Sequence, residues 1–352
     1  MNFELSDDHQ MLADTLARFF ADTLPMDRRN AIAYAAPYHA PEIWRNLAEL
    51  GVLGAFFSED IGGFGGTAQD VAVVFETVGR ALCPEPLLGH LMAGRLLSEL
   101  GRTEMVEQMI AGEAKLALAV VEPGVTTDLS LITSEAVEKG GAWLLTGTKT
   151  AIYGGPSADH LLIAARVGHG LGLFRAPTPA MTVAGMTDGG GIAEMVMKDL
   201  EAECLSSDAG AAIASALDLG RIALCSEAVG AMSWLIEATT AYLAERKQFG
   251  RSLATFQALQ HRLVDLVGEL EQARSITISA VSAYGTTDQT KRAAMAKNLV
   301  GRAAVKVAEE CIQMHGGIGM TWEYAGSHYV KRLIMLDAQL GDRFDMVGAM
   351  GG

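Results

Sequence analysis

Apolar residues recur at helical spacing through the first third of the chain. Ser6 is followed by two aspartates, as at a capped helix start, and Leu16 and Phe20 continue an apolar face. Further periodic stretches predict helices over residues 41–51, from about 67 onward, over 86–100 and over 103–111. We therefore predict an N-terminal α-helical domain over residues 1–112.

The pattern changes near Lys115 from helical spacing to short apolar runs. Residues 116–121 form one run, and residues 136–145 have the pattern of two strands around a Gly-Gly turn. Other strand-like pieces, separated by Gly, Pro or Ser, cover residues 160–167, 172–175, 181–183 and 195–197. These pieces predict a small middle β domain over residues 113–205.

Long helical periodicity returns after Ser207. Leu217 and Ile222 belong to one apolar helix, and Leu259, Leu263 and Leu266 line another. Four long helices with short connections fit the remaining length, as in a four-helix bundle. We predict this bundle over residues 206–352, so the expected fold is mainly α with a central β domain.

The charge balance limits the possible ligands. Among 352 residues, 27 Lys and Arg stand against 42 Asp and Glu, which gives a net charge of −15. Such a chain has no broad electrostatic footprint for nucleic acid or an anionic membrane. Any anionic ligand must therefore be held by a local site.

Cysteine spacing and the N-terminus bear on the compartment. The four cysteines lie far apart without a CxxC pair, and the histidines show no ligand spacing, so we expect neither a disulfide framework nor a metal site. The N-terminus is acidic where a secretory signal would be basic, and no run approaches the roughly 20 apolar residues of a membrane span. We expect a cytoplasmic protein without a membrane span.

Two segments interrupt the helical pattern with polar groups. Residues 245–251, Glu-Arg-Lys-Gln-Phe-Gly-Arg, concentrate cations at a helix end, where they could bind a phosphate or simply complement the negative helix C-terminus. Residues 313–321, Gln-Met-His-Gly-Gly-Ile-Gly-Met-Thr, could allow close backbone approach to a ligand, or could be a helix–helix turn with glycine caps. Both alternatives stay open for each segment on spacing alone.

Together these segments resemble motifs of the acyl-CoA dehydrogenase family. Arg246-Lys247-Gln248-Phe249-Gly250 is followed by Phe256-Gln257 and later by Gln313-Met314-His315-Gly316-Gly317. Upstream, residues 58–66 are similar to the family's P-E-x-x-G-G-x-G loop, and Glu122-Pro123-Gly124 matches the core of its T-E-P-G-A-G-S-D strand. The resemblance extends in order over nearly the whole chain.

The resemblance implies a helical domain, a β-barrel and a helical bundle, with FAD held between subunits. It assigns to the adenosine diphosphate part of the flavin the residues Arg246, Gln248, Phe249, Phe256, Gln257, Gln313, Gly316 and Gly317, and to its ring side Val121 and Thr127. It also implies an acyl-CoA substrate, an electron-transfer flavoprotein or similar acceptor, and a homo- or hetero-oligomer, as a dimer or tetramer.

The family's base, a glutamate that removes the α-proton of the thioester, is missing from both usual places. Counting about 24 residues from Gly316 reaches Leu340, and the position early in the first bundle helix is Gly220. Asp218, Glu227, Asp337 and Asp342 are other nearby carboxylates, of which Glu227 has the most favourable direction. The catalytic residue is therefore unknown.

The ring-side motifs also differ from the family pattern. Ala151 and Tyr153 stand where the family has a tryptophan and a threonine. The chain thus resembles the small subunit of heteromeric bacterial acyl-CoA dehydrogenases, of which the pimeloyl-CoA dehydrogenase small-subunit type is one. We expect α,β-desaturation of an acyl-CoA by a hetero-oligomer. The alternatives are a non-catalytic flavin-site or assembly subunit, and a flavin monooxygenase or oxidase on the same fold.

Overall fold

The structure of the protein is a computed structural model that describes residues 5–125 and 128–350. The chain opens with helices, as the apolar spacing predicted, and the hydroxyl of Ser6 caps the first by accepting the N–H of His9 at 3.2 Å. The helix not predicted, α2, lacks a regular apolar face. The helices are α1 (Asp7–Thr23), α2 (Met26–Ala33), α3 (Pro41–Glu49), α4 (Ala68–Ala81), α5 (Leu87–Glu99) and α6 (Thr103–Ile110).

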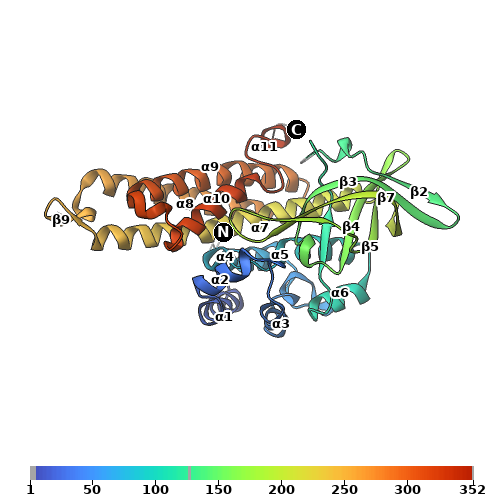
Figure 1. Ribbon diagram of the computed structural model, residues 1–352, viewed down its shortest axis with the longest axis horizontal. Coiled ribbons are helices and arrows are strands. Elements are labelled where there is room, and N and C mark those ends of the chain that lie inside the picture. Colours follow the sequence, from blue (N-terminus) through green and yellow to red (C-terminus); the bar gives the residue numbers. More distant parts are fainter. Residues whose placement is uncertain (1–4, 126–127, 351–352) are drawn as a thin grey trace. The chain divides into compact units, whose positions relative to one another are not determined.

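The middle of the chain forms a closed sheet (Figure 1). The strand order is β1-β4-β2-β3-β7-β5, and β5 pairs again with β4, which closes a barrel, while β6 lies against β7. Buried alanine, leucine, isoleucine and methionine side chains, with Phe174, form its core. The strands are β1 (Leu116–Ala119), β2 (Glu135–Lys139), β3 (Ala142–Tyr153), β4 (His160–Val167), β5 (Gly170–Pro177), β6 (Thr182–Gly185) and β7 (Gly191–Ser206).

Strand lengths differ from those predicted wherever a strand has a polar face. The limits of β4 agree with the prediction, but β7 has 16 residues where only residues 195–197 were predicted. Met195 and Met197 point into the core, whereas Glu194 and Lys198 are exposed, so charged residues interrupt the apolar signal on both sides of residues 195–197. Pairing with β3, β5 and β6 supplies the backbone partners that extend β7.

Among the described residues, four long helices follow the barrel, as predicted. Helix α9 packs against α8 and α10, and the short strands β8 and β9 form a hairpin between α7 and α8. These elements are α7 (Gly210–Glu245), β8 (Lys247–Gln248), β9 (Arg251–Ser252), α8 (Gln257–Ala283), α9 (Gln289–His315), α10 (Ala325–Ala338) and α11 (Met346–Met350). Turns of 3-10 helix lie at η1 (Gly54–Phe56), η2 (Glu59–Ile61), η3 (Leu129–Leu131), η4 (Gly155–Ser157), η5 (Leu253–Thr255) and η6 (Gly316–Met320).

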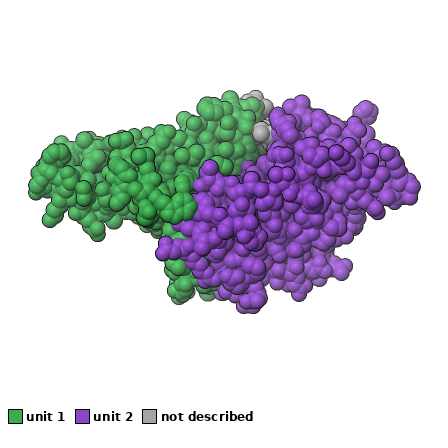
Figure 2. Space-filling model, in the orientation of Figure 1, with its two compact units in different colours: residues 1–26, 72–83, 221–352 green, residues 27–71, 84–220 purple. Residues whose placement is uncertain are grey.

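The chain divides into two compact units (Figure 2). Unit 1 comprises Met1–Met26, Ala72–Cys83 and Arg221–Gly352, and unit 2 comprises Asp27–Val71 and Pro84–Gly220. The barrel lies in unit 2, and α8, α9 and α10 lie in unit 1. The predicted boundaries after residues 112 and 205 stay a prediction.

Helix α7 is the longest and most apolar helix in the described part of the chain. It is long and apolar enough to cross a membrane, but 89% of its most apolar window is buried inside the protein. Its apolar residues therefore belong to the core of the fold.

Within unit 1, α7 and α4 touch through their backbones. A Cβ atom on Gly230 would lie 1.9 Å from the carbonyl oxygen of Glu76, and one on Gly79 would lie 2.0 Å from that of Glu227. No real side chain approaches a backbone atom so closely. The two glycines are therefore what allows the helices to meet at this point.

Candidate functional site

The cationic segment after α7 folds into a tight hairpin. Gln248 pairs with Arg251, and between them Phe249 and Gly250 have φ angles of 54° and 79°. Two successive left-handed residues are typical of a type I′ turn. The turn leaves the ring of Phe249 90% exposed.

The other predicted residues of this segment surround the hairpin. Arg246 and Gln248 are exposed, and Gln257 begins α8 with an exposed side chain. Phe256, half-buried, lies edge-on to Phe249 with 6.2 Å between ring centroids, and the guanidinium of Arg251 lies 4.0 Å from the Phe256 centroid. The hairpin and the start of α8 thus present aromatic, amide and cationic groups together.

The glycine-rich segment begins where α9 ends. Gly316 caps the helix with φ 67° and ψ −145°, and Gly317 follows it in η6. Gln313, Gly316 and Gly317 are all exposed, and no atom lies within 4 Å of a Cβ placed on either glycine. The space beside these glycines is open to a ligand.

A buried histidine joins the glycine-rich segment to α7. The ring of His315 stacks on Tyr242 with centroids 4.4 Å apart, and its Nδ1 and Nε2 lie 2.8 Å from the carbonyl oxygen of Cys311 and 2.7 Å from the hydroxyl of Tyr324. Tyr242 precedes Arg246 by one helical turn. The structure therefore brings the cationic and the glycine-rich segments to the same end of unit 1.

These residues suit one half of a dinucleotide site. A guanidinium and accessible backbone amides match a pyrophosphate, and an exposed aromatic ring can stack on a base. All of the groups lie on the surface, so the described chain presents a half-site that a second chain could complete.

One of the two predicted ring-side residues, Val121, lies in unit 2. Val121 follows β1 and is half-buried, and its carbonyl oxygen accepts the N–H of Thr150 at 2.9 Å. Thr127 lies outside the described residues. Ala151, where the family has tryptophan, has a φ of 51° at an irregularity of the β3–β7 pairing.

A buried ion pair supports the turn after Val121. Lys149 Nζ donates to Glu122 Oε1 at 2.7 Å, and Lys149 is fully buried. The other carboxylate oxygen accepts the N–H and hydroxyl of Thr133, both at 2.7 Å, and Oε1 also accepts the N–H of Ser134 at 3.0 Å. Despite desolvation, these donors lower the pKa of Glu122 to about 2. Burial lowers the pKa of Lys149 to about 8.

The two positions predicted for the base carry no carboxylate. Gly220 lies within α7, and Leu340 lies in a turn after α10 with a φ of 55°. Leu340 is buried, with 5% of its surface exposed. Neither residue can accept a proton.

The four carboxylates considered as alternative bases are buried or already accept hydrogen bonds within the chain. Glu227 is buried and receives two bonds from Arg332, Nε to Oε1 at 2.6 Å and Nη2 to Oε2 at 2.8 Å. Asp337 accepts the N–H of Arg343 at 3.2 Å, and Asp342 accepts the backbone N–H groups of Phe344 and Asp345. The fourth, Asp218, is buried in α7. Glu227 therefore has a structural partner and is not a free base.

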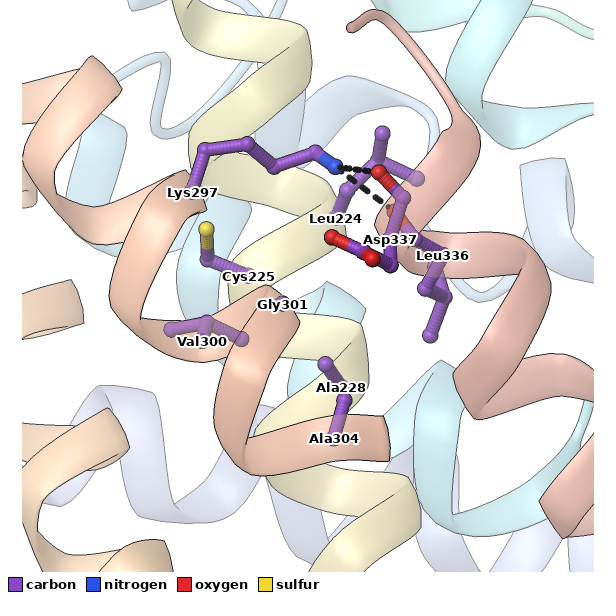
Figure 3. Close-up of a pocket in the computed structure, with 9 residues that line it drawn as sticks. All are labelled: Leu224, Cys225, Ala228, Lys297, Val300, Gly301, Ala304, Leu336 and Asp337. Atoms are coloured by element: carbon purple, nitrogen blue, oxygen red, sulfur yellow. Dashed lines mark hydrogen bonds between the residues drawn. The ribbon is translucent and has the colours of Figure 1, made fainter. Parts of the chain in front are cut away.

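A small pocket in unit 1 lies between α7, α9 and the end of α10 (Figure 3). Its walls are apolar apart from Cys225, Lys297 and Asp337, and it has room for little more than a water molecule. It is too small for an acyl chain. Among the residues that the structure describes, no group of three or more His, Cys, Asp or Glu side chains is arranged to hold a metal ion.

Sequence reasoning missed the roles of the buried cations Lys149, Arg221 and Lys297 and of the half-buried Arg332. Arg221 and Lys297 stand in largely apolar stretches of their helices, and that interruption was the signal available for those two. Composition cannot say which partner neutralises such a cation, because the partners are distant in sequence. Glu122 and Lys149, for example, are separated by 27 positions.

The chain is similar to known proteins over nearly its whole length. Residues 6–115 match the acyl-CoA dehydrogenase N-terminal domain, and residues 209–341 match the acyl-CoA dehydrogenase C-terminal domain. The acyl-CoA dehydrogenase IpdE2 of Mycobacterium tuberculosis is 32% identical, over 93% of this chain and 91% of that protein.

Solved structures agree with this similarity. The structure described as the Tcur3481-Tcur3483 steroid ACAD G363A variant superposes with a TM-score of 0.91 and 29% identity, covering 98% of this chain and 97% of that chain. The structure described as the FAD complex of PigA has a TM-score of 0.88 and 26% identity, with coverage of 100% and 98%.

Proposed function

The chain belongs to the acyl-CoA dehydrogenase family, and we propose that it is a subunit of a hetero-oligomeric, FAD-dependent acyl-CoA dehydrogenase in which the partner supplies the base. The proposed reaction is α,β-desaturation of an acyl-CoA thioester. One observation carries the proposal: the two predicted base positions hold Gly220 and Leu340, while Glu227 is held by Arg332.

FAD is the proposed cofactor, and when bound it accepts the hydride that leaves the substrate. Arg246, Gly316 and Gly317 would hold its pyrophosphate, and Phe249 with Phe256 would border the adenosine. Gln248, Gln257 and Gln313 supply amide groups around them. Val121 and Thr127 are the proposed ring-side contacts. The exposure of the whole cluster in unit 1 supports a site completed by a second chain.

A partner is needed because the reaction requires proton removal. The α C–H of a thioester is a weak acid, so a positioned carboxylate must accept the proton while hydrogen bonds stabilise the charge on the thioester oxygen. The side chains of Gly220 and Leu340 offer no acceptor. In the proposed assembly, this chain contributes flavin-binding groups and apolar walls, and the partner contributes the carboxylate.

The substrate and acceptor are proposed by class. The steroid named for the superposed heteromeric structure makes a steroid-derived acyl-CoA the first substrate to test. An electron-transfer flavoprotein is the proposed acceptor, and the cytoplasm is the proposed compartment. The likeness to the pimeloyl-CoA small-subunit type stays a prediction.

Co-expression with a longer homologue that carries glutamate at one base position tests the proposal. The chain purified alone should bind little flavin and leave it oxidised when acyl-CoA is added. The co-purified pair should be yellow, and its flavin should bleach anaerobically with the acyl-CoA. Turnover by the chain alone would contradict the proposal.

A matched control locates the base. Glutamate-to-glutamine substitution at the partner's base position should abolish bleaching while flavin content stays unchanged. Flavin that never bleaches in the unsubstituted pair would instead indicate a non-catalytic assembly subunit. Oxygen consumption coupled to flavin reoxidation would indicate an oxidase or monooxygenase.

A further inference from the structure

The turn that follows α10 is strained. Helix α10 ends at Ala338, Gln339 is extended, and Leu340 and Gly341 have φ angles of 55° and 92°. A left-handed conformation is costly for a branched residue such as leucine. In addition, Gln339 Oε1 is buried without a hydrogen-bond partner among the residues described. A turn with two unfavourable features must be held in place by its surroundings.

Lys297 holds the end of α10. Its Nζ donates to the carbonyl oxygens of Leu336 at 2.8 Å and Asp337 at 2.6 Å, which Figure 3 shows as dashed lines reaching from α9 to the end of α10. A helix leaves its last carbonyls without intrahelical partners, and a cation there complements the helix dipole. Lys297 is 2% exposed, so water contributes little to solvating this ammonium.

Further contacts hold the turn on its other side. Arg221 on α7 donates Nε to the carbonyl oxygen of Leu340 at 3.1 Å, and Asn298 on α9 donates to that of Arg343 at 2.7 Å. A Cβ on Gly301 would lie 2.1 Å from Asp337 Oδ1, so the glycine admits the end of α10 to α9. All of these contacts lie within unit 1. They fix the backbone on both sides of residue 340.

We propose that Lys297 and Arg221 are positioning residues, which hold the turn Gln339–Gly341 and thereby fix the direction of the Leu340 side chain. This inference rests on the proposed function, because the direction of residue 340 matters for the reaction only if this residue stands at a base position of the family. Two buried cations hold the backbone on both sides of residue 340 in one conformation, although the side chain at this position is apolar. In the proposed assembly, this turn sets the direction in which Leu340 faces the acyl-CoA site.

Hydrogen–deuterium exchange tests directly whether Lys297 and Arg221 hold this turn. In Lys297→Met, amides of residues 336–343 should exchange at least about tenfold faster than in the wild type, because two bonds that anchor the segment are lost. Arg221→Met should produce the same local change from the opposite side. Lys291→Met, an exposed position on α9, is the matched control and should change nothing.

The outcomes distinguish a local role of Lys297 at this turn from a general contribution to the stability of the protein. Unchanged exchange in residues 336–343 of Lys297→Met, or faster exchange spread evenly over α8 and the barrel, would overturn the proposal. In the co-purified flavin complex, the local change should also weaken the spectral shift caused by octanoyl-CoA at unchanged flavin content. If the wild-type complex binds no FAD, the proposed function fails, while the exchange result still decides the role of Lys297.

Discussion

At the scale of single residues, this protein places charges where hydrophobic burial would be expected. Lys149 and Glu122 form a buried pair, and the half-buried Arg332 pairs with the buried carboxylate of Glu227. Desolvation offsets much of the attraction in such pairs, so their net contribution to stability is modest. Substituting one partner lowers stability strongly, however, because the other is left as an uncompensated buried charge. The pairs therefore specify geometry more than they add free energy.

Acid titration should reveal the Glu122 pair. The pKa of Glu122 is about 2 in the folded protein against an ordinary value of 4.5. Its contribution, on the order of 3 kcal/mol, is complete above about pH 4.5 and is lost as the pH falls toward 2. Urea unfolding of Glu122→Gln should show a shallower loss of stability over this window. Exposed Glu138→Gln should keep the wild-type slope, and identical slopes in all three proteins would contradict the pairing.

The Arg332–Glu227 pair predicts a non-additive mutant cycle. Arg332→Met alone should lower the free energy of unfolding by about 3–5 kcal/mol, because it removes the cation that pairs with the buried Glu227 carboxylate. The double variant Arg332→Met with Glu227→Leu should recover most of that loss. Chemical denaturation of the single and double variants checks this. A double variant as unstable as the sum of its parts would rule out a direct pair.

At the scale of elements, backbone contact decides how helices pack. The crossing of α4 and α7 depends on Gly79 and Gly230, at which any side chain would collide with a backbone carbonyl. Glycine inside a helix normally weakens it by about 1 kcal/mol relative to alanine. Here that intrinsic cost is outweighed by the contact that the missing side chain permits.

Alanine at Gly230 and alanine at Gly268 should therefore have effects of opposite sign on stability. Gly230→Ala should destabilise the protein by about 1–3 kcal/mol or more, because the helices must separate. Gly268→Ala on α8, where nothing lies within 4 Å of the added atom, should stabilise it by about 1 kcal/mol. Thermal unfolding of both variants tests the comparison. Stabilisation by both substitutions would show that α4 and α7 do not touch there.

The elements also show which parts of the fold the sequence could predict. Apolar spacing predicted α1, α3, α4, α5 and α6 and the exact limits of β4, because each has a continuous apolar face. It missed α2, which has no such face, and most of β7, whose exposed glutamates interrupt the pattern. The motif segments at Arg246 and Gly316 were recognisable, but their shared location depends on the contact of Tyr242 with His315, which no local pattern contains.

At the scale of the whole molecule, the proposed site requires assembly. The chain carries a net charge of −15, yet its cationic hairpin and accessible glycines gather at one end of unit 1. An isolated surface of this kind gives a dinucleotide few contacts, whereas two facing surfaces can enclose it. Flavin retention should therefore depend on the oligomer.

Arg246 should control flavin retention without changing the fold. In the assembled complex, Arg246→Ala should lower the flavin-to-protein ratio by about tenfold at low cofactor concentration, since a charge-assisted bond to the pyrophosphate is lost. Lys247→Ala, the adjacent exposed cation, is the control. Gel filtration should show the same assembly in both. Equal flavin content in the two variants would remove Arg246 from the proposed site.

The exposed ring of Phe249 has a consequence for how the protein is made. The hairpin closes through local contacts and displays this ring as soon as the bundle folds, before any second chain arrives. Molecules synthesised in excess of a partner that covers the ring keep this apolar group in contact with water. Balanced production of both components, with early encounter during translation, would keep that ring covered.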